Sequence, residues 1–355
     1  MPEPRPELAA LGAYRPGRPE GTAGATLVNL AANENPWGPS PGVARRLLSL
    51  ALHRYPDMAG EQLLAQLADD WQLGPDELLL GTGSGHLIKC LAEAYVRPGD
   101  PVVVCDPTFS LYRADAQLMG GRVAALPGSG HSVDFSGLAS FVRRTAPRLV
   151  FACSPNNPTG DALDAAQVDA LCDALPAGSL AVIDEAYVHF AESPADTLGY
   201  VRRGAPIAVL RTFSKAYGLA GMRLGVLAAP PGVIADVRRV REPFPASVPA
   251  LAAAEAAAAD KDHLARVIAD TRAGRGDLMR ELGARGFDVH PGHGNFVWAR
   301  VPGASAEGLV LALRREGVLV RDGAGFGVPS HVRVSVGTPA EIAALVQALD
   351  RIDQR

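Results

Sequence analysis

Residues 211–225 bring together side chains that suit phosphate binding and amine chemistry. The segment holds one lysine, Lys215, with two hydroxyls and two guanidiniums, those of Thr212, Ser214, Arg211 and Arg223. Hydroxyl and guanidinium groups donate hydrogen bonds to phosphate oxygens, and a lysine in a low-dielectric pocket favours the neutral amine that Schiff-base chemistry requires. Apolar runs at 207–210 and 224–228 flank the segment, which favours a functional loop between buried strands over a solvated surface loop.

Glycines mark two places where the backbone is expected to approach a ligand closely. Gly218 and Gly221 lie in the lysine segment, and the run Gly81-Thr82-Gly83-Ser84-Gly85 joins a predicted strand to a predicted helix. Such a turn presents backbone N–H groups and the positive end of a helix dipole to an anion. A dinucleotide-binding unit starts similarly, but here the spacing is G-x-G-x-G instead of G-x-G-x-x-G, and no acid ends a strand about 20 residues later. The turn therefore indicates a phosphate site of another kind.

Length and composition predict a globular protein of two domains. The chain has 355 residues, more than one core comfortably supports, with 48% hydrophobic and 20% charged residues. The net charge of -4 gives no reason to expect nucleic acid or an anionic membrane as a partner. No run approaches the ~20 apolar residues of a membrane span, and residues 1–6 lack the apolar core of a signal peptide. The four cysteines show no metal-ligand spacing, so we expect reduced thiols, no metal site and a cytoplasmic location.

Apolar runs alternate with helical segments, which predicts an α/β fold with a mainly parallel sheet. The predicted strands are 27–30, 77–80, 101–105, 122–126, 148–152, 180–183, 207–210 and 224–228, with helices that include 43–53, 61–73 and 165–174. After residue 245 we expect alanine-rich helices at 249–259 and 264–282, then strands at 287–290, 295–300, 318–320 and 332–336 with helices at 307–316 and 339–352. The expected domains are an N-terminal arm with part of a small α+β domain (1–48), a large domain (49–245) and the rest of the small domain (246–355).

Polar and aromatic residues follow the buried strands, where ligands of open α/β sheets bind. Asp184 ends one strand and requires a cationic or hydrogen-donating partner if it is buried, although it also suits a helix cap. Phe109 is suited to stack on an aromatic ring, although a bare phenylalanine more often packs in a core. Asn157 lies between two prolines, in a turn that can fix an amide donor, and Glu185 is expected to be a structural acid.

Six further motifs occur along the chain: Asn33-Glu34-Asn35-Pro36, Arg54-Tyr55-Pro56-Asp57, Pro107-Thr108-Phe109, Ser154-Pro155-Asn156-Asn157-Pro158-Thr159-Gly160, Asp184-Glu185-Ala186-Tyr187 and Arg333-Val334-Ser335-Val336-Gly337-Thr338. With the lysine segment, they resemble the motifs of the histidinol-phosphate aminotransferases, in the same order and over nearly the whole chain. These enzymes belong to the aspartate aminotransferase superfamily, the fold type I enzymes of pyridoxal phosphate (PLP). The resemblance implies a large domain with a mainly parallel sheet, a small α+β domain and PLP as the cofactor.

The resemblance also implies a role for individual residues. Lys215 would carry PLP covalently and move the substrate proton, Asp184 would keep the pyridine nitrogen protonated, and Tyr187 would reach the O3′ atom. The other matched cofactor residues are Gly83, Ser84, Gly85, Phe109, Asn157, Thr212, Ser214, Arg223 and, across the interface of a homodimer with shared active sites, Tyr55. The matched substrate residues are Tyr14, Asn35, Arg321 and Arg333. His86 stands where the family usually has an acid, and it is either a helix-start residue or a new contact.

The implied reaction transfers an amino group from histidinol phosphate to 2-oxoglutarate in histidine biosynthesis, giving imidazole acetol phosphate and glutamate. Three alternatives stay open. An aromatic amino-acid aminotransferase would use Arg333 to hold a carboxylate, and a threonine-phosphate decarboxylase of cobalamin synthesis is suggested by residues 291–295. A non-catalytic PLP-binding regulator is the third, and the lack of a sequence resembling a DNA-reading module argues against it. Because arginines bind phosphate and carboxylate alike, the sequence leaves the amino donor open.

Overall fold

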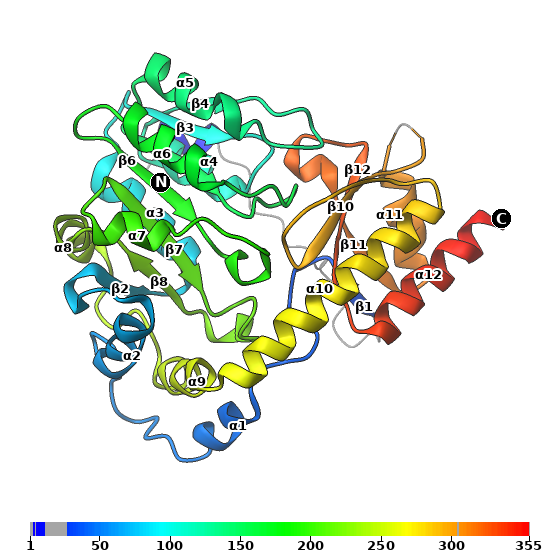
Figure 1. The fold of residues 1–355 in the computed structure, drawn as a ribbon, viewed down its shortest axis with the longest axis horizontal. Coiled ribbons are helices and arrows are strands. Elements are labelled where there is room, and N and C mark those ends of the chain that lie inside the picture. Colours follow the sequence, from blue (N-terminus) through cyan, green and yellow to red (C-terminus); the bar gives the residue numbers. More distant parts are fainter. Residues whose placement is uncertain (1–2, 4, 11–26, 304, 355) are drawn as a thin grey trace.

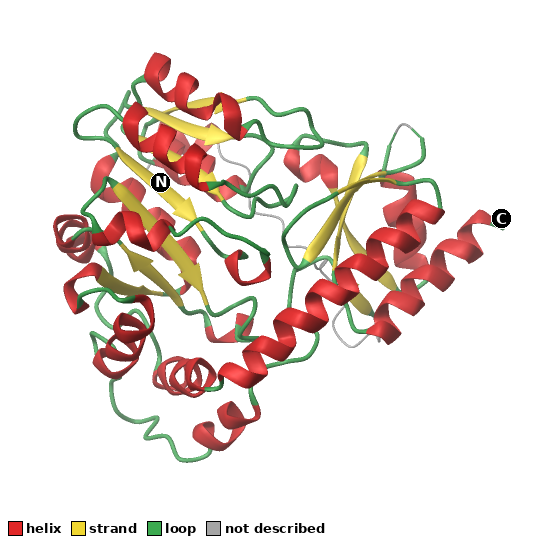
Figure 2. Cartoon of the chain, in the orientation of Figure 1, coloured by secondary structure: helices red, strands yellow, loops and turns green. Residues whose placement is uncertain are grey.

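Two β-sheets of different size organise the molecule. The computed structural model describes residues 3, 5–10, 27–303 and 305–354. One sheet has seven strands in the order β2-β8-β7-β6-β5-β3-β4, and the other has five in the order β1-β11-β12-β10-β9 (Figure 1). Helices surround the larger sheet, whereas the long helix α10 and helix α12 lie along one side of the smaller sheet (Figure 2).

The larger sheet is mainly parallel, as the sequence predicts. Strand β8 runs antiparallel to β2 and β7, and the other neighbouring strands are parallel. The strands are β2 (Leu78–Gly81), β3 (Pro101–Cys105), β4 (Arg122–Leu126), β5 (Leu149–Cys153), β6 (Leu180–Asp184), β7 (Ile207–Thr212) and β8 (Gly225–Ala228). Their carboxyl ends, apart from that of antiparallel β8, meet at one edge, and this edge positions the site described below.

Successive residues of these strands face two apolar cores. Val103 of β3 lies in a core shared with helices α1, α2, α5, α6, α7 and α9, whereas Val104 lies in a core shared with α3, α4 and α8. Because both faces are covered, the strands consist of continuous apolar runs. The helices are α1 (Pro41–Leu47), α2 (Glu61–Trp71), α3 (Gly83–Tyr95), α4 (Ser110–Leu118), α5 (Phe135–Thr145), α6 (Ala165–Ala174), α7 (Thr197–Arg202), α8 (Pro231–Val240) and α9 (Val248–Ala259).

The smaller sheet combines segments from both ends of the chain. Its strands are β1 (Val28–Leu30), β9 (Asp288–His290), β10 (Phe296–Arg300), β11 (Val318–Asp322) and β12 (His331–Ser335), and β1 pairs in parallel with β11. Helices α10 (Lys261–Ala284), α11 (Glu307–Arg315) and α12 (Pro339–Asp353) close a third apolar core against it. Within the part of the chain that the structure describes, no helix is both long and apolar enough to cross a membrane.

Helix α1 is shorter than the sequence predicts. A helix was expected over 43–53, but α1 ends at Leu47. Leu48 and Leu52 are 87% and 71% exposed, so the segment after α1 has no apolar core against which another helical turn would be stabilised.

Helix α9 packs against α1 and α2 in the core of the larger sheet. The next helix, α10, then leads to the smaller sheet (Figure 1).

Candidate active site

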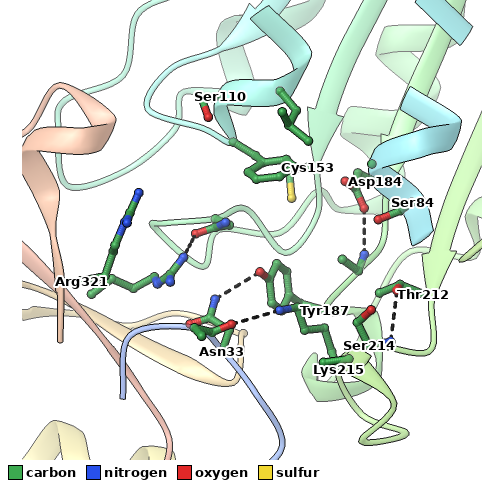
Figure 3. A pocket seen from close by; sticks show the side chains of 18 of the residues that line it. Asn33, Ser84, Ser110, Cys153, Asp184, Tyr187, Thr212, Ser214, Lys215 and Arg321 are labelled. Carbon is green, nitrogen blue, oxygen red and sulfur yellow. Dashed lines mark hydrogen bonds between the residues drawn. The ribbon is translucent and has the colours of Figure 1, made fainter. Parts of the chain in front are cut away.

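A cavity of ≈ 500 Å³ lies at the carboxyl edge of the larger sheet and reaches residues of the smaller sheet (Figure 3). Strands β5, β6 and β7 each end at a residue that lines it, respectively Cys153, Asp184 and Thr212. Most of the predicted site residues line this cavity: Ser84, Gly85, Phe109, Asn157, Asp184, Tyr187, Thr212, Ser214, Lys215, Arg223, Arg321 and Arg333. The fold therefore brings together groups that lie far apart in the sequence.

One end of the cavity is built to receive an anion. Helix α3 begins at Gly83, and Ser84 and Gly85 of its first turn line the cavity, so the positive end of the helix dipole lies at this end of it. Arg223 lies close to the same turn: a Cβ atom built on Gly83 would be 2.7 Å from the Nη2 atom of Arg223. The Nη1 atom of Arg223 donates to the Ser214 hydroxyl at 3.4 Å. Gly83 also has a φ of +76°, a left-handed backbone conformation that favours glycine at this position.

Asp184 provides a buried acid elsewhere in the cavity. It is 3% exposed, and its carboxylate accepts hydrogen bonds from the Tyr112 hydroxyl at 2.7 Å and from the Ala186 N–H at 3.1 Å. Burial raises the pKa of Asp184 to about 6, although these two hydrogen bonds favour the ionised form and oppose the shift. A buried carboxylate of this kind is suited to hold a cationic N–H group of a ligand.

Lys215 has the properties of an amine nucleophile. Its Nζ atom donates to the Ala32 carbonyl at 3.2 Å and lies 5.7 Å from the centroid of the Tyr187 ring. Burial lowers the pKa of Lys215 to about 8, and the positive charge of Arg333 acts in the same direction. About a tenth of the amine is therefore neutral at pH 7, and this is the form that Schiff-base chemistry requires.

Tyr187 is held by a residue that the sequence interpretation missed. Its hydroxyl accepts a hydrogen bond from Asn33 Nδ2 at 3.1 Å, and the Asn33 Oδ1 atom accepts from the Ser335 hydroxyl at 2.9 Å. Burial raises the pKa of Tyr187, so the phenol is neutral at ordinary pH. The sequence interpretation selected Asn35 from the same motif, but Asn35 does not line the cavity. Its amide donates to the backbone carbonyls of Ala216 and Gly38 instead.

Two arginines on the smaller sheet face the cavity. Arg321 and Arg333 are register partners on the antiparallel strands β11 and β12, so their side chains leave neighbouring points of the sheet. Both guanidiniums lie near the Phe326 ring, at 5.8 and 5.7 Å from its centroid. Arg333 is 6% exposed and donates to the Asn157 Oδ1 atom and to the Ala31 carbonyl. Both arginines line the same cavity as Lys215.

Some residues of the lysine segment do not act as the sequence suggests. The Arg211 side chain pairs with Glu185 at 2.8 Å and lies over the Trp71 ring, and it does not line the cavity. Successive residues of a strand face opposite sides, so Arg211 points away where Thr212 points in. Gly218 does approach the backbone of Gly38 closely, whereas a Cβ on Gly221 would meet no protein atom within 4 Å, so packing within the protein does not require glycine at position 221.

Tyr55 and His86 lie away from the cavity lining. Tyr55 is 83% exposed, stacks on Phe244 with ring centroids 4.8 Å apart, and does not line the cavity of its own chain. Tyr14 lies outside the described residues. His86 accepts from the Thr82 N–H at 3.2 Å through Nδ1, so its proton is on Nε2, which lies 2.9 Å from the Glu242 carboxylate. His86 therefore behaves as a helix-start residue that closes the glycine turn and does not line the cavity.

The family of the chain follows from a comparison with known sequences. A family profile described as aminotransferase class I and II matches residues 25–349. The chain belongs to this family, which confirms the resemblance drawn from the motifs and its fold type.

Two of the curated proteins similar to this chain are both named histidinol-phosphate aminotransferase. The histidinol-phosphate aminotransferase of Symbiobacterium thermophilum is 41% identical over 91% of this chain and 90% of its own length, and that of Moorella thermoacetica is 37% identical over 99% and 93%. Among solved structures, the histidinol-phosphate aminotransferase from Sinorhizobium meliloti in complex with pyridoxal-5'-phosphate is similar, with a TM-score of 0.90, 28% identity and coverage of 98% and 97%.

Proposed function

We propose that this protein is a PLP-dependent aminotransferase that transfers the amino group of histidinol phosphate to 2-oxoglutarate. One observation carries the proposal: a single cavity holds an anion-binding helix start, a buried acid, a lysine and two arginines. The names of relatives that match nearly the full length of the chain support the choice of amino donor.

The groups that line the cavity fit PLP. The first turn of α3 with Ser84, Ser214 and Arg223 supplies donors for its phosphate, and Asp184 supplies an acceptor for its ring nitrogen. Phe109 offers a ring face for stacking, and Asn157 and Tyr187 offer polar groups for the O3′ atom. When it is bound, PLP supplies an electron sink that stabilises negative charge on the substrate Cα atom.

The protein's own groups would then handle the proton and the substrate. Lys215, whose pKa is lowered to about 8, would take the proton from the substrate Cα atom as a general base and then hold it as a general acid. Asp184, buried and hydrogen-bonded, would stabilise a proton on the ring nitrogen. Arg321 and Arg333 bind the phosphate of the amino donor in one half-reaction and the carboxylates of glutamate and 2-oxoglutarate in the other.

A single-turnover experiment tests the amino donor. The PLP-loaded protein is mixed in parallel with histidinol phosphate, phenylalanine and threonine phosphate, and the cofactor's visible absorbance is followed. We expect fast loss of the visible band with histidinol phosphate alone. A preference for phenylalanine would favour an aromatic amino-acid aminotransferase. Release of carbon dioxide from threonine phosphate would favour a decarboxylase, and no reaction with any of the three amines would favour a regulator.

We also propose a homodimer in which Tyr55 of each subunit completes the other subunit's site. Among the described residues, several of the most exposed large apolar side chains gather in or beside one segment, namely Leu48, Leu52, Tyr55, Met58 and Phe244. Exposed apolar patches of this kind mark protein interfaces. Replacing Leu48 and Leu52 by glutamate is expected to shift the protein from dimer to monomer in sedimentation experiments, and unchanged mass would contradict the interface.

The domain division and the location are proposals as well. We propose residues 49–245 together with α1 and α9 as the large domain, because both helices share the core of the larger sheet. The small domain then consists of β1 and the chain from α10 on. We propose a cytoplasmic location, which suits the four free thiols, three of them buried.

A further inference from the structure

Tyr112 occupies a central position that the proposed mechanism has not used. It lies in the first turn of α4, it is fully buried, and its hydroxyl is 2.7 Å from the Asp184 Oδ2 atom. Its ring stacks on Phe151, with centroids 5.2 Å apart and planes 8° apart, and meets the Phe109 ring edge-on at 5.6 Å. Tyr112 therefore contacts Asp184, which we propose for the ring nitrogen of the cofactor, and Phe109, which we propose to stack on the face of that ring.

The direction of the hydrogen bond is fixed by the acidities of the two groups. Burial raises the pKa of Tyr112 well above its usual value, and the nearby Asp184 charge adds to this, so the phenol keeps its proton and donates it. The Ala186 N–H occupies the other carboxylate oxygen, Oδ1. The ionisable groups facing Asp184 are Tyr112 from α4, Cys153 from β5, Glu185 and Tyr187 from the following turn, and Lys215 from the lysine segment.

Among these neighbours, Tyr112 is the side chain that hydrogen-bonds to Asp184 directly. Cys153 points its Sγ atom at the Pro155 carbonyl, and Glu185 is bound by Arg211 and Thr197. A donor to the ionised form lowers the pKa of a carboxyl, whereas burial raises it. At this site the two effects oppose each other. Removing the phenol leaves the Ala186 N–H and the charge of Lys215 to oppose burial, while the charge of Glu185 acts in the same direction as burial.

We propose that Tyr112 is a positioning residue: its phenol fixes the orientation of the Asp184 carboxylate and keeps it ionised at neutral pH. This inference rests on the proposed function, because Asp184 serves the ring nitrogen only if PLP is bound. The contacts with Phe151 and Phe109 make the arrangement rigid, since they hold the Tyr112 ring from its face and its edge. In the absence of the phenol, Asp184 is protonated over a wider pH range and holds the pyridine nitrogen less well.

The test uses Tyr112→Phe, which keeps the ring and removes only the hydroxyl. Tyr200→Phe is the matched control, because Tyr200 also donates its phenol to a carboxylate, that of Asp169, and does not line the cavity. The affinity of the cofactor-free proteins for PLP is measured at pH 6 and at pH 8.5. We expect Tyr112→Phe to bind PLP about tenfold more weakly at pH 6 and to recover most of that loss at pH 8.5, where Asp184 ionises without help.

A merely structural role predicts a different result. If Tyr112 only fills the core, the loss of affinity is equal at both pH values, and that outcome, or no loss at either, overturns the proposal. Tyr200→Phe should match the unchanged protein at both. A change in its PLP affinity with the same pH dependence would also overturn the proposal, since any lost phenol–carboxylate bond would then produce it.

A second measurement does not require PLP. The Asp184 carboxyl is titrated by carbon NMR in cofactor-free protein labelled at aspartate, and its signal is assigned from the Asp184→Asn variant. Tyr112→Phe should raise its pKa by about one unit, whereas Tyr200→Phe should leave it in place. An unchanged pKa overturns the role of Tyr112 even if PLP binds. Failure of the unchanged protein to bind PLP, with the shift in pKa present, overturns the proposed function instead and leaves Tyr112 as the group that keeps Asp184 ionised.

Discussion

Burial gives the two ionisable groups at the centre of the cavity opposite shifts. The pKa of Asp184 rises to about 6 and that of Lys215 falls to about 8, because a low dielectric disfavours both charges. Between these values the acid is mainly ionised and a useful share of the lysine is neutral. An acid that can hold a ring proton and an amine that can accept a substrate proton therefore coexist near neutral pH.

The shifted amine makes a testable prediction about pH. A lysine with a pKa near 8 is about 10% neutral at pH 7 and about 90% neutral at pH 9, whereas an ordinary lysine is almost fully protonated throughout. The rate at which cofactor-free protein gains the visible PLP chromophore should rise through a midpoint near pH 8. Borohydride followed by peptide mapping should place the label on Lys215 and not on Lys89 or Lys261, the other lysines of the chain. A rate that still climbs beyond pH 10 would contradict the shift.

The position of a site residue was predictable from the sequence where that residue directly follows a buried strand. Asp184 follows an apolar run and Lys215 lies between two such runs, so both had to lie at the ligand-binding edge of the sheet. Asn33 and Tyr112 were not predictable in this way. Asn33 reaches Tyr187 only because the small sheet, built from distant segments, holds it through Ser335. Tyr112 follows Phe109 by three residues, a helical spacing that could have indicated it.

At the scale of elements, the strands were predicted closely because they are buried on both faces. The predicted strand at 101–105 coincides with β3, and that at 122–126 with β4. Helix α1 was predicted less well, because its apolar residues continue past the point where a packing partner ends. Sequence periodicity reports amphipathic character, whereas the length of a helix also depends on tertiary contacts that the sequence does not display.

The contact between β8 and the start of α3 predicts the effect of a glycine substitution. A Cβ atom on Gly225 would lie 2.4 Å from the Ser84 backbone nitrogen, so Gly225→Ala must displace the turn that we propose for the cofactor phosphate. We expect PLP affinity to fall by tenfold or more, as overpacking of this kind typically costs about 1–3 kcal/mol. Gly221→Ala is the control from the same segment, because its Cβ would meet no atom within 4 Å. Equal affinities of the two variants in a PLP titration would show that the turn tolerates the displacement.

At the scale of the whole molecule, two histidine–aspartate pairs join β9 of the smaller sheet to the segments before α5 and α6. His290 of β9 lies 2.8 Å from Asp161, which precedes α6, and His131, which precedes α5, lies 3.0 Å from Asp288 of β9. Asp161 also accepts a hydrogen bond from the Val133 N–H at 2.8 Å. These contacts fix the small sheet, and with it the two arginines, relative to the lysine segment.

The Asp161 contacts should contribute measurably to stability. Although burial opposes it, the hydrogen bonds from His290, Thr159 and Val133 lower the pKa of Asp161 below its usual value. A carboxyl whose folded-state pKa is lowered stabilises the protein above its unfolded pKa, and this contribution is lost as pH falls through the folded value. Asp161→Asn should therefore lower the free energy of unfolding by about 2 kcal/mol at pH 7. In denaturant titrations the exposed Asp173→Asn serves as control, and equal midpoints would contradict the prediction.

The proposed shared site makes the last prediction, which concerns two subunits. Tyr55 is exposed beside Phe244 and does not line the cavity of its own chain, so its proposed contact with the cofactor requires an interface between two subunits. Loss of a hydrogen bond to a charged group costs about 1.5–3 kcal/mol, so Tyr55→Phe alone should reduce activity roughly tenfold or more, and Lys215→Ala alone should abolish it.

Mixing the two variants should restore activity if the sites are shared. In a hybrid dimer, one site combines an intact Lys215 with an intact Tyr55 from the other subunit, and the second site carries both defects. Equal mixing places about half of the chains in hybrids, so about a quarter of all sites are intact by the symmetry of the dimer. Activity should rise toward that fraction as subunits exchange, with exchange verified by mass spectrometry of isotope-labelled chains. Complete exchange without any gain over the average of the parents would place Tyr55 outside the partner's site.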